Sequence, residues 1–357
     1  MQIDFIISSI KGGGAERVMV LLANYFASKG HQIRIITFST TIAYTIDRKV
    51  EVSILDKSNI KNHKLKWLYN LFLFYKKKKN RPSILISFST LTNMISIIIA
   101  KLYHIKIIVS EHNNHLRVPN PKFLTNFTRN TLYPLADTVT VLTKYDVEFY
   151  EKKGSKVTVM PNPCTFTPIE KSLKNREKTI LAVGRLNRYN HKGFDNLIDI
   201  VKEAFEGNDE WVLKILGDGD RGLSFLKEKV SQYGLENKVI FEGFCSNVAE
   251  YMEKSEIFIL SSRYEGLPMV LLEAMSQGMS CISYDCITGP SDIITHGYNG
   301  ILVKDQDKDL MVKELKELMN DFELRETLSK NAIKSLNSFE IENIYKKWMV
   351  LINEVTN

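Results

Sequence analysis

The chain of 357 residues has few cysteines and lacks any long apolar run. Its four cysteines, at positions 164, 245, 281 and 286, form no Cys-x-x-Cys pair, and the chain has no His-x-x-x-His pair. This pattern argues against a structural zinc site and a disulfide framework, and it favours a reducing, cytoplasmic location. No stretch reaches about 18 consecutive apolar residues, so no segment is a candidate membrane span. The first residues enter an apolar strand pattern with no basic segment before it, so we expect no signal peptide.

Acidic residues are scarce in the first half. Up to residue 165 there are 24 Lys and Arg against 10 Asp and Glu, a net charge of +14, and the remainder has 24 against 31, a net charge of −7. This asymmetry indicates that the first half faces an anionic partner. We find no signature of a nucleic-acid-binding protein, so nucleic acid is not the expected partner.

The densest basic segment spans residues 61–81, where lysine clusters lie on both sides of aromatic and aliphatic residues. Such a segment can lie on an anionic membrane surface, where each lysine contributes about 1 kcal/mol. A domain helix with a solvated lysine tail explains the same pattern.

Apolar runs typical of strands alternate with helical patterns along the whole chain, which indicates parallel sheets with crossover helices. We expect strands at residues 4–8, 32–37, 83–87, 105–110, 138–142, 157–160, 179–183, 211–216, 239–241, 257–260, 281–284 and 300–303. The polar run from Glu170 to Lys178 is typical of a linker. The pattern predicts two doubly wound α/β domains, 1–165 and 166–338, each with its ligand edge at the carboxyl ends of the strands. A last helix within 339–357 is expected to pack back on the first domain.

Two carboxylates lie eight positions apart in the segment Glu265–Glu273, where a Gly-Leu-Pro turn leads into an apolar stretch. If a helix begins near Pro268, the amides of Met269 and Val270 form an anion site at the positive end of the helix dipole. Glu265 would then lie outside the helix mouth and Glu273 about one turn inside, as a nucleotide with a sugar on its diphosphate requires. An amphipathic helix with an ordinary glutamate at each end explains the segment equally well.

Other expected strand ends in the second half also carry charged residues. Arg185 and Lys192 follow the strand at 179–183, and together they could hold one diphosphate, the arginine as a fork and the lysine as a point charge. Two unrelated surface cations are the alternative. Asp218 and Asp220 lie among glycines with no third oxygen ligand nearby, which favours a turn over a metal site.

The first half places a glycine-rich loop and a histidine at strand ends. The loop Gly12–Gly14 allows a ligand to approach the backbone at a helix N-terminus. It is not Gly-x-Gly-x-x-Gly, because Arg17 takes the last position, and no Gly-Lys-Ser/Thr follows, so the dinucleotide and P-loop interpretations both fail. His112 follows the strand at 105–110, where an imidazole could reach a ligand, although isolated histidines are usually structural.

Several motifs together resemble a known family. In order and spacing, the chain resembles the retaining GT-B glycosyltransferases of family 4 at Gly184-Arg185, Lys192-Gly193, Gly217-Asp218-Gly219, Phe241–Phe244, Ser262–Met275 and Gly297–Val303. The loop Gly12–Val18 is similar to that of the bacterial branch that builds capsule, O-antigen and lipid-linked oligosaccharides. The resemblance implies two Rossmann-like domains facing a central cleft, with the nucleotide-sugar bound mainly by the second and the acceptor mainly by the first.

The resemblance also implies roles for individual residues. Arg185 and Lys192 would bind the donor diphosphate together with the amides of Met269 and Val270. Glu273 would bind the ribose hydroxyls, and Glu265 the hydroxyls of the transferred sugar. The remaining implied contacts are Phe244 beside the base, Leu267 in the donor site, Gly13 and Gly14 on the donor phosphate or sugar, and His112 on the transferred sugar near the reaction centre.

The activity implied by the resemblance is a retaining, metal-independent transfer of a hexose or N-acetylhexosamine from a UDP-sugar. The acceptor would be a polyprenyl-diphosphate-linked or polysaccharide glycan, and the enzyme would lie at the inner face of the plasma membrane, attached through segment 61–81. No cofactor is expected besides the donor substrate. Two alternatives remain: a nucleotide-sugar epimerase of the same fold, which would act on the donor alone, and a non-enzymatic membrane-binding module, which leaves the charged strand ends without a purpose.

Overall fold

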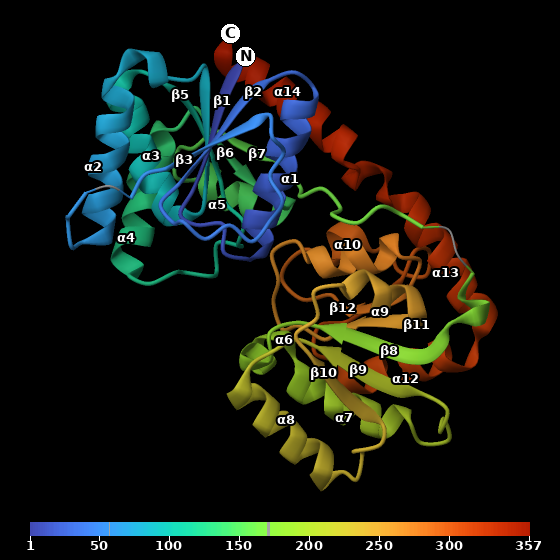
Figure 1. Cartoon of the computed structure of the whole chain (residues 1–357). Helices are drawn as coiled ribbons and strands as arrows, with labels where there is room; N and C mark the ends of the chain where they lie inside the picture. Colours follow the sequence, from blue (N-terminus) through green and yellow to red (C-terminus); the bar gives the residue numbers. More distant parts are fainter. Residues whose placement is uncertain (57, 170–171) are drawn as a thin grey trace. The chain divides into compact units, whose positions relative to one another are not determined.

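The computed structural model describes residues 1–56, 58–169 and 172–357, and these form two compact units. Unit 1 comprises Met1–Pro163 and Phe339–Asn357, and unit 2 comprises Cys164–Ser338. Each unit is a parallel sheet packed between helices (Figure 1). The predicted pair of doubly wound α/β domains is confirmed.

Unit 1 contains a seven-stranded parallel sheet in the order β3-β2-β1-β4-β5-β6-β7. Its strands are β1 (Gln2–Ile7), β2 (Gln32–Thr37), β3 (Val50–Ile54), β4 (Ile84–Phe88), β5 (Lys106–Ser110), β6 (Thr138–Val141) and β7 (Val157–Val159). Its α-helices are α1 (Gly14–Ser28), α2 (His63–Lys76), α3 (Thr90–Tyr103), α4 (Lys122–Phe127), α5 (Val147–Glu151) and α14 (Ile341–Thr356). The central strands are buried on both faces, so they appear in the sequence as continuous apolar runs.

Unit 2 contains a six-stranded parallel sheet in the order β10-β9-β8-β11-β12-β13. Its strands are β8 (Glu177–Val183), β9 (Val212–Leu216), β10 (Val239–Gly243), β11 (Ser255–Leu260), β12 (Ser280–Tyr284) and β13 (Ile301–Val303). Its α-helices are α6 (Tyr189–Lys192), α7 (Phe194–Ala204), α8 (Asp220–Gln232), α9 (Val248–Lys254), α10 (Met269–Ser276), α11 (Pro290–Ile293), α12 (Lys308–Asn320) and α13 (Phe322–Ser335). The strand order reverses between β8 and β11, which is where sheets of this kind bind ligands.

The prediction of a linker at Glu170–Lys178 was wrong for its described part; residues 170 and 171 lie outside the described residues. Leu173 is buried, and its amide donates to the Glu326 carboxylate at 2.6 Å. The Arg176 guanidinium donates to the carbonyls of Met252 and Gln277 at 3.1 and 2.8 Å. The described part of the run belongs to unit 2 and forms hydrogen bonds with the rest of that unit, and β8 begins within it.

Helix α14 lies in unit 1 although it ends the chain. Tyr345 packs edge-on against Tyr25 and Phe26 of α1, with ring centroids 5.4 and 4.9 Å apart. Lys29 and Glu342 form an ion pair at 2.9 Å, and Trp348 is 2% exposed. The apolar face of α14 therefore completes the outer layer of unit 1 beside α1.

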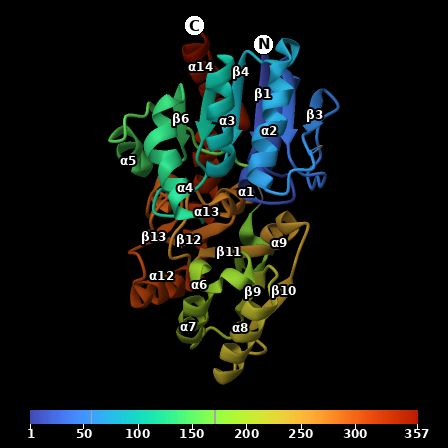
Figure 2. The ribbon, with the colours of Figure 1, turned by 90° about the vertical axis from the view of Figure 1, so that its left-hand side faces the viewer.

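Helix α2 accounts for most of the basic segment 61–81. It begins at an Asn62 cap, whose side chain accepts from the Lys64 amide at 3.0 Å, and it lies beside α3 (Figure 2). The buried Tyr75 hydroxyl donates to Asp4 of β1 at 2.6 Å. The segment is thus a domain helix, but an apolar stripe on it stays exposed, made of Leu65, Tyr69 and Leu73. The membrane-surface interpretation of this stripe and of the exposed lysines 76–79 stays a prediction.

No helix in the described part of the chain is both long enough and apolar enough to cross a bilayer.

Candidate functional site

The loops at the carboxyl edge of the unit 2 sheet are tied to one another by backbone hydrogen bonds. The Leu186 amide, after β8, donates to the Asp218 carbonyl, after β9, at 2.7 Å. The Glu265 amide, after β11, donates to the Ile287 carbonyl, after β12, at 3.0 Å. Neighbouring loops are therefore held in a fixed arrangement along one edge of the sheet.

Two glycines allow these loops to approach closely. Gly193 has φ +67°, and a Cβ at this position would lie 1.9 Å from the Ser261 carbonyl oxygen. Gly217 has φ +147°, and its Cβ would lie 1.8 Å from the Gly184 carbonyl oxygen. Any side chain would both strain the backbone and separate the loops. The close approach at Gly193 sets Lys192 beside the loop that follows β11.

Lys192 and Glu265 form an ion pair, although 73 residues separate them. The Lys192 Nζ lies 2.7 Å from Glu265 Oε1, and the Ser262 hydroxyl donates to the same oxygen at 2.6 Å. The two side chains are only 19% and 11% exposed. Burial raises the pKa of Glu265, but the charge and hydrogen bond of Lys192 outweigh it and hold this pKa below its ordinary value. Glu265 is therefore a carboxylate at neutral pH.

Helix α10 begins at Met269 with Pro268 as its N-cap, so the predicted helix start is confirmed. The Pro268 carbonyl accepts from the Leu271 amide at 3.0 Å, which closes the first turn. Glu273 lies inside the helix and is 6% exposed, and its carboxylate accepts from the Thr165 hydroxyl at 2.5 Å. Glu265 thus stands outside the helix mouth and Glu273 one turn inside it, in the order expected from the sequence.

The remaining predicted donor residues of unit 2 stand at the ends of different strands. Arg185 is exposed and caps a short 3-10 helix, Leu186–Arg188, after β8. Phe244 follows β10 and is 77% exposed, whereas Leu267 is buried in front of α10. The structure brings Lys192 and Glu265 into direct contact, and it places Arg185 and Phe244 along the same carboxyl edge.

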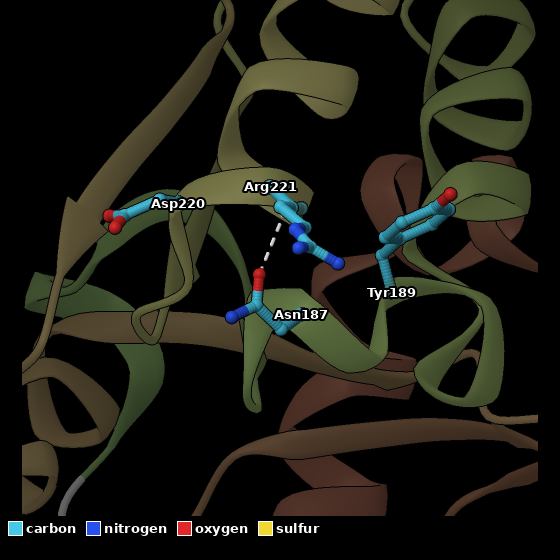
Figure 3. A pocket seen from close by; sticks show the side chains of 5 residues that line it. Asn187, Tyr189, Asp220 and Arg221 are labelled. Carbon is cyan, nitrogen blue, oxygen red and sulfur yellow. Dashed lines mark hydrogen bonds between the residues drawn. The ribbon is translucent and has the colours of Figure 1, made fainter.

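A polar cavity of about 470 Å³, which the sequence analysis missed, lies between the loop after β8 and the start of α8. Figure 3 shows the Arg221 side chain between Asn187 and Tyr189, whereas Asp220 points away from them. The Asn187 side-chain oxygen accepts from the Gly222 amide at 3.1 Å. The predicted turn at 217–220 is confirmed, since both of its glycines have positive φ and α8 begins at Asp220. Among the described residues, no group of three or more His, Cys, Asp or Glu side chains is arranged to hold a metal ion.

In unit 1, the glycine loop after β1 is fixed by a residue that the sequence analysis missed. The Gly13 amide donates to the Tyr44 hydroxyl at 2.8 Å, and this hydroxyl donates to the Gly13 carbonyl at 3.0 Å. The Ala43 amide also donates to Ile10 at 2.8 Å. Tyr44 therefore determines where the loop presents Gly14 at the start of α1.

His112 follows β5 on the same edge of unit 1. Its Nε2 lies 3.2 Å from the Ser110 hydroxyl, and its ring lies 5.1 Å from that of Phe88. Burial lowers the pKa of His112 to about 4, so the imidazole is neutral at neutral pH. The preceding Glu111 is buried and accepts from Thr90 at 2.9 Å and from Tyr133, which anchors the loop.

Comparison with known proteins places these features in a family. A family model described as Glycosyltransferase Family 4 matches residues 12–165, and one described as Glycosyl transferases group 1 matches residues 166–335. The Campylobacter jejuni enzyme named GalNAc-alpha-(1->4)-GalNAc-alpha-(1->3)-diNAcBac-PP-undecaprenol alpha-1,4-N-acetyl-D-galactosaminyltransferase is 33% identical, over 100% of this chain and 99% of that enzyme. The amylovoran biosynthesis glycosyltransferase AmsD of Erwinia amylovora is 30% identical, over 96% of each chain.

A solved structure supports the same fold. The structure of the lipopolysaccharide outer core galactosyltransferase WaaB, in its apo form, matches 99% of both chains with a TM-score of 0.78 at 22% identity.

Proposed function

This chain belongs to the GT-B glycosyltransferases, and from that membership we propose that it moves a hexose or N-acetylhexosamine from a UDP-sugar to a glycan. The acceptor in this proposal is a lipid-linked or polysaccharide glycan of the cell surface. Two relatives support it, since the Campylobacter enzyme is named for an undecaprenol-linked glycan and the Erwinia enzyme for amylovoran biosynthesis.

The observation that carries the proposal is the Lys192–Glu265 ion pair beside the mouth of α10. An ammonium and a helix N-terminus both favour a diphosphate, and a carboxylate favours sugar hydroxyls. Lys192 would turn toward the diphosphate when the donor binds, and Glu265 would then accept from the transferred sugar. Glu273, one turn inside the helix, would accept from the ribose hydroxyls.

The proposed reaction proceeds with retention of the anomeric configuration. The bond between the anomeric carbon and the diphosphate oxygen breaks, and the acceptor oxygen forms its bond on the same face. The leaving phosphate oxygen takes the proton of the acceptor hydroxyl. Arg185, Lys192 and the amides of Met269 and Val270 would stabilise the charge that develops on the diphosphate, and one such group is worth about 3 kcal/mol. The proposal requires no metal ion or further cofactor.

In this proposal unit 1 binds the acceptor, and three of its residues also contact the donor. A neutral His112 would form a hydrogen bond with the transferred sugar without adding charge, and the backbone of Gly13 and Gly14 would contact the donor. The exposed stripe of α2 and lysines 76–79 would hold the enzyme on the anionic inner face of the plasma membrane, as a cytoplasmic, peripheral protein.

Transfer by purified full-length protein tests the proposal. A panel of UDP- and GDP-sugars is screened for thermal stabilisation, and the donor found is assayed with a short polyprenyl-diphosphate-linked glycan. Arg185→Ala and Lys192→Ala should abolish transfer. Lys229→Ala, which removes the ion pair with Asp199 at 2.6 Å, is the matched control and should retain transfer activity.

Near-normal turnover in both site variants would refute the assignment of the diphosphate ligands. A changed sugar nucleotide formed from the donor alone would show epimerase activity instead.

A further inference from the structure

Unit 1 has a cavity of about 420 Å³ at the carboxyl ends of β1, β2 and β3, which none of the roles above uses. Hydroxyl residues that follow β1 and β2 line it, among them Ser9 and Ser39. The other walls are formed by Lys11, Phe38, Asp56 and Trp67. It therefore combines an aromatic wall, hydroxyl groups, a carboxylate and an ammonium at the edge where doubly wound sheets bind ligands.

The aromatic wall is held rigidly. The Trp67 indole, from α2, stacks on the buried Phe38 ring with centroids 4.8 Å apart and planes at 15°. The His63 ring packs edge-on against Trp67 at 5.4 Å. Phe38 covers one face of the indole, and the part of Trp67 that lines the cavity is an apolar surface on which the C–H groups of a sugar ring can pack.

The polar wall suits hydroxyl groups. The Lys66 Nζ lies 2.5 Å from Asp56 Oδ1 in an ion pair, yet 45% of the Asp56 side chain remains exposed. A carboxylate held in place by a lysine accepts two or more hydrogen bonds from neighbouring hydroxyls, and serine hydroxyls both donate and accept. The hydroxyls of a sugar ring can donate to this carboxylate and exchange hydrogen bonds with the serines. The chemistry of the cavity therefore suits a sugar ring.

We propose that this cavity binds a sugar residue of the acceptor glycan, with its ring on Trp67 and its hydroxyls on Asp56 and the serines. The role of that sugar as acceptor rests on the proposed transferase function, but its binding does not require transfer. An experiment can therefore refute sugar binding in this cavity without refuting the transferase function, and the reverse.

Tryptophan fluorescence gives a direct test. The chain has three tryptophans, and Trp211 and Trp348 are 0% and 2% exposed, so iodide in solution should quench Trp67 selectively. Trp67→Phe, which keeps an aromatic ring against Phe38, should remove the quenching and so assign the signal. The probes are the methyl α-glycosides of N-acetylgalactosamine, galactose and glucose. A bound glycoside should shield Trp67, and at half occupancy the quenching constant should fall by about half.

Two variants distinguish an effect at the cavity from an effect on the neighbouring strand β3. Asp56→Asn should lose the protection by glycosides, because the amide replaces one acceptor oxygen by a donor. Glu51→Gln on β3 is the matched control, since Glu51 is exposed and lies outside the cavity lining. In the transfer assay, Asp56→Asn should raise KM for the glycan about tenfold, as for a lost hydrogen bond to a charged group, with kcat and the donor KM unchanged.

The fluorescence results decide whether the cavity is a sugar site. Protection in the wild type that Asp56→Asn loses and Glu51→Gln keeps supports the sugar site, even if no donor gives transfer. Absence of protection by every glycoside overturns the proposal. Protection by the UDP-sugar instead of the glycosides also overturns it, because the cavity would then be a donor site.

Discussion

Replacement of Lys192 by alanine should destabilise unit 2, because it removes the cation that compensates the largely buried carboxylate of Glu265. In the wild type, the Lys192 ammonium lies 2.7 Å from that carboxylate, which is only 11% exposed. Removal of one partner of a buried ion pair costs about 3–5 kcal/mol, and the residual exposure of both groups sets the expected loss at about 3 kcal/mol. The double variant Lys192→Ala/Glu265→Gln should recover part of this loss, because the glutamine carries no charge.

The same argument predicts how the loss depends on pH. In the wild type, Lys192 holds the pKa of Glu265 below its ordinary value, so the stabilisation is present at neutral pH and is lost as pH falls through that lowered pKa. In Lys192→Ala, burial dominates and the pKa of Glu265 should rise above its ordinary value. That variant then binds a proton more readily than its unfolded chain, so its deficit against the wild type should shrink as pH falls from 7 toward 4.

Unit 2 contains one tryptophan, the fully buried Trp211, which makes its unfolding measurable. In a Trp67→Phe/Trp348→Phe background, urea titrations followed by fluorescence report unit 2, and they give the free energy of unfolding of each variant. Lys229→Ala is the matched control, with an expected loss of about 1 kcal/mol, because its partner Asp199 is 30% exposed. Wild-type stability in Lys192→Ala, or a double variant whose loss equals the sum of the single losses, would refute the reasoning.

Three further predictions concern unit 1. Burial lowers the pKa of His112 from 6.5 to about 4, so the unfolded chain binds a proton first and the free energy of unfolding falls as pH drops across this range, by up to about 3 kcal/mol. His112→Gln should remove that part of the pH dependence in urea titrations. An unchanged dependence of the free energy of unfolding on pH in this variant would contradict the prediction. Tyr44→Phe removes both hydrogen bonds to Gly13, so the amide of Gly13 should exchange hydrogen about ten times faster, and equal exchange would show that the loop is held elsewhere. Replacement of lysines 76–79 by glutamine should weaken sedimentation with anionic liposomes by about 1 kcal/mol per lysine near the surface, whereas unchanged, salt-sensitive binding would assign them to a solvated tail.

Features set by local chemistry were predictable from the sequence. The start of α10 follows from Pro268, whose fixed φ and missing N–H suit a helix N-terminus, and the buried strands follow from apolar runs. The edge strand β3 was missed, because its five residues alternate Val50-Glu-Val-Ser-Ile54 and carry only a short apolar signal.

Features that depend on tertiary contacts were not predictable from pattern alone. The contact between Lys192 and Glu265 joins α6 to the loop after β11, and it depends on the close approach of the two segments at Gly193. Tyr44 reaches Gly13 across 31 residues without any motif to mark it. The polar run after residue 171 imitates a linker, since hydrogen bonds to buried carbonyls and hydrogen bonds to water select the same residue types.

The position of α14 sets the order in which the two units can be completed during synthesis. Unit 2 is one continuous stretch, Cys164–Ser338, and it is fully translated before α14 leaves the ribosome. Unit 1 starts first but must wait for Tyr345 to cover the Tyr25 and Phe26 rings of α1. A nascent chain that stalls shortly before its end therefore carries a complete unit 2 and an unfinished unit 1, and the apolar surface that it exposes is that of α1.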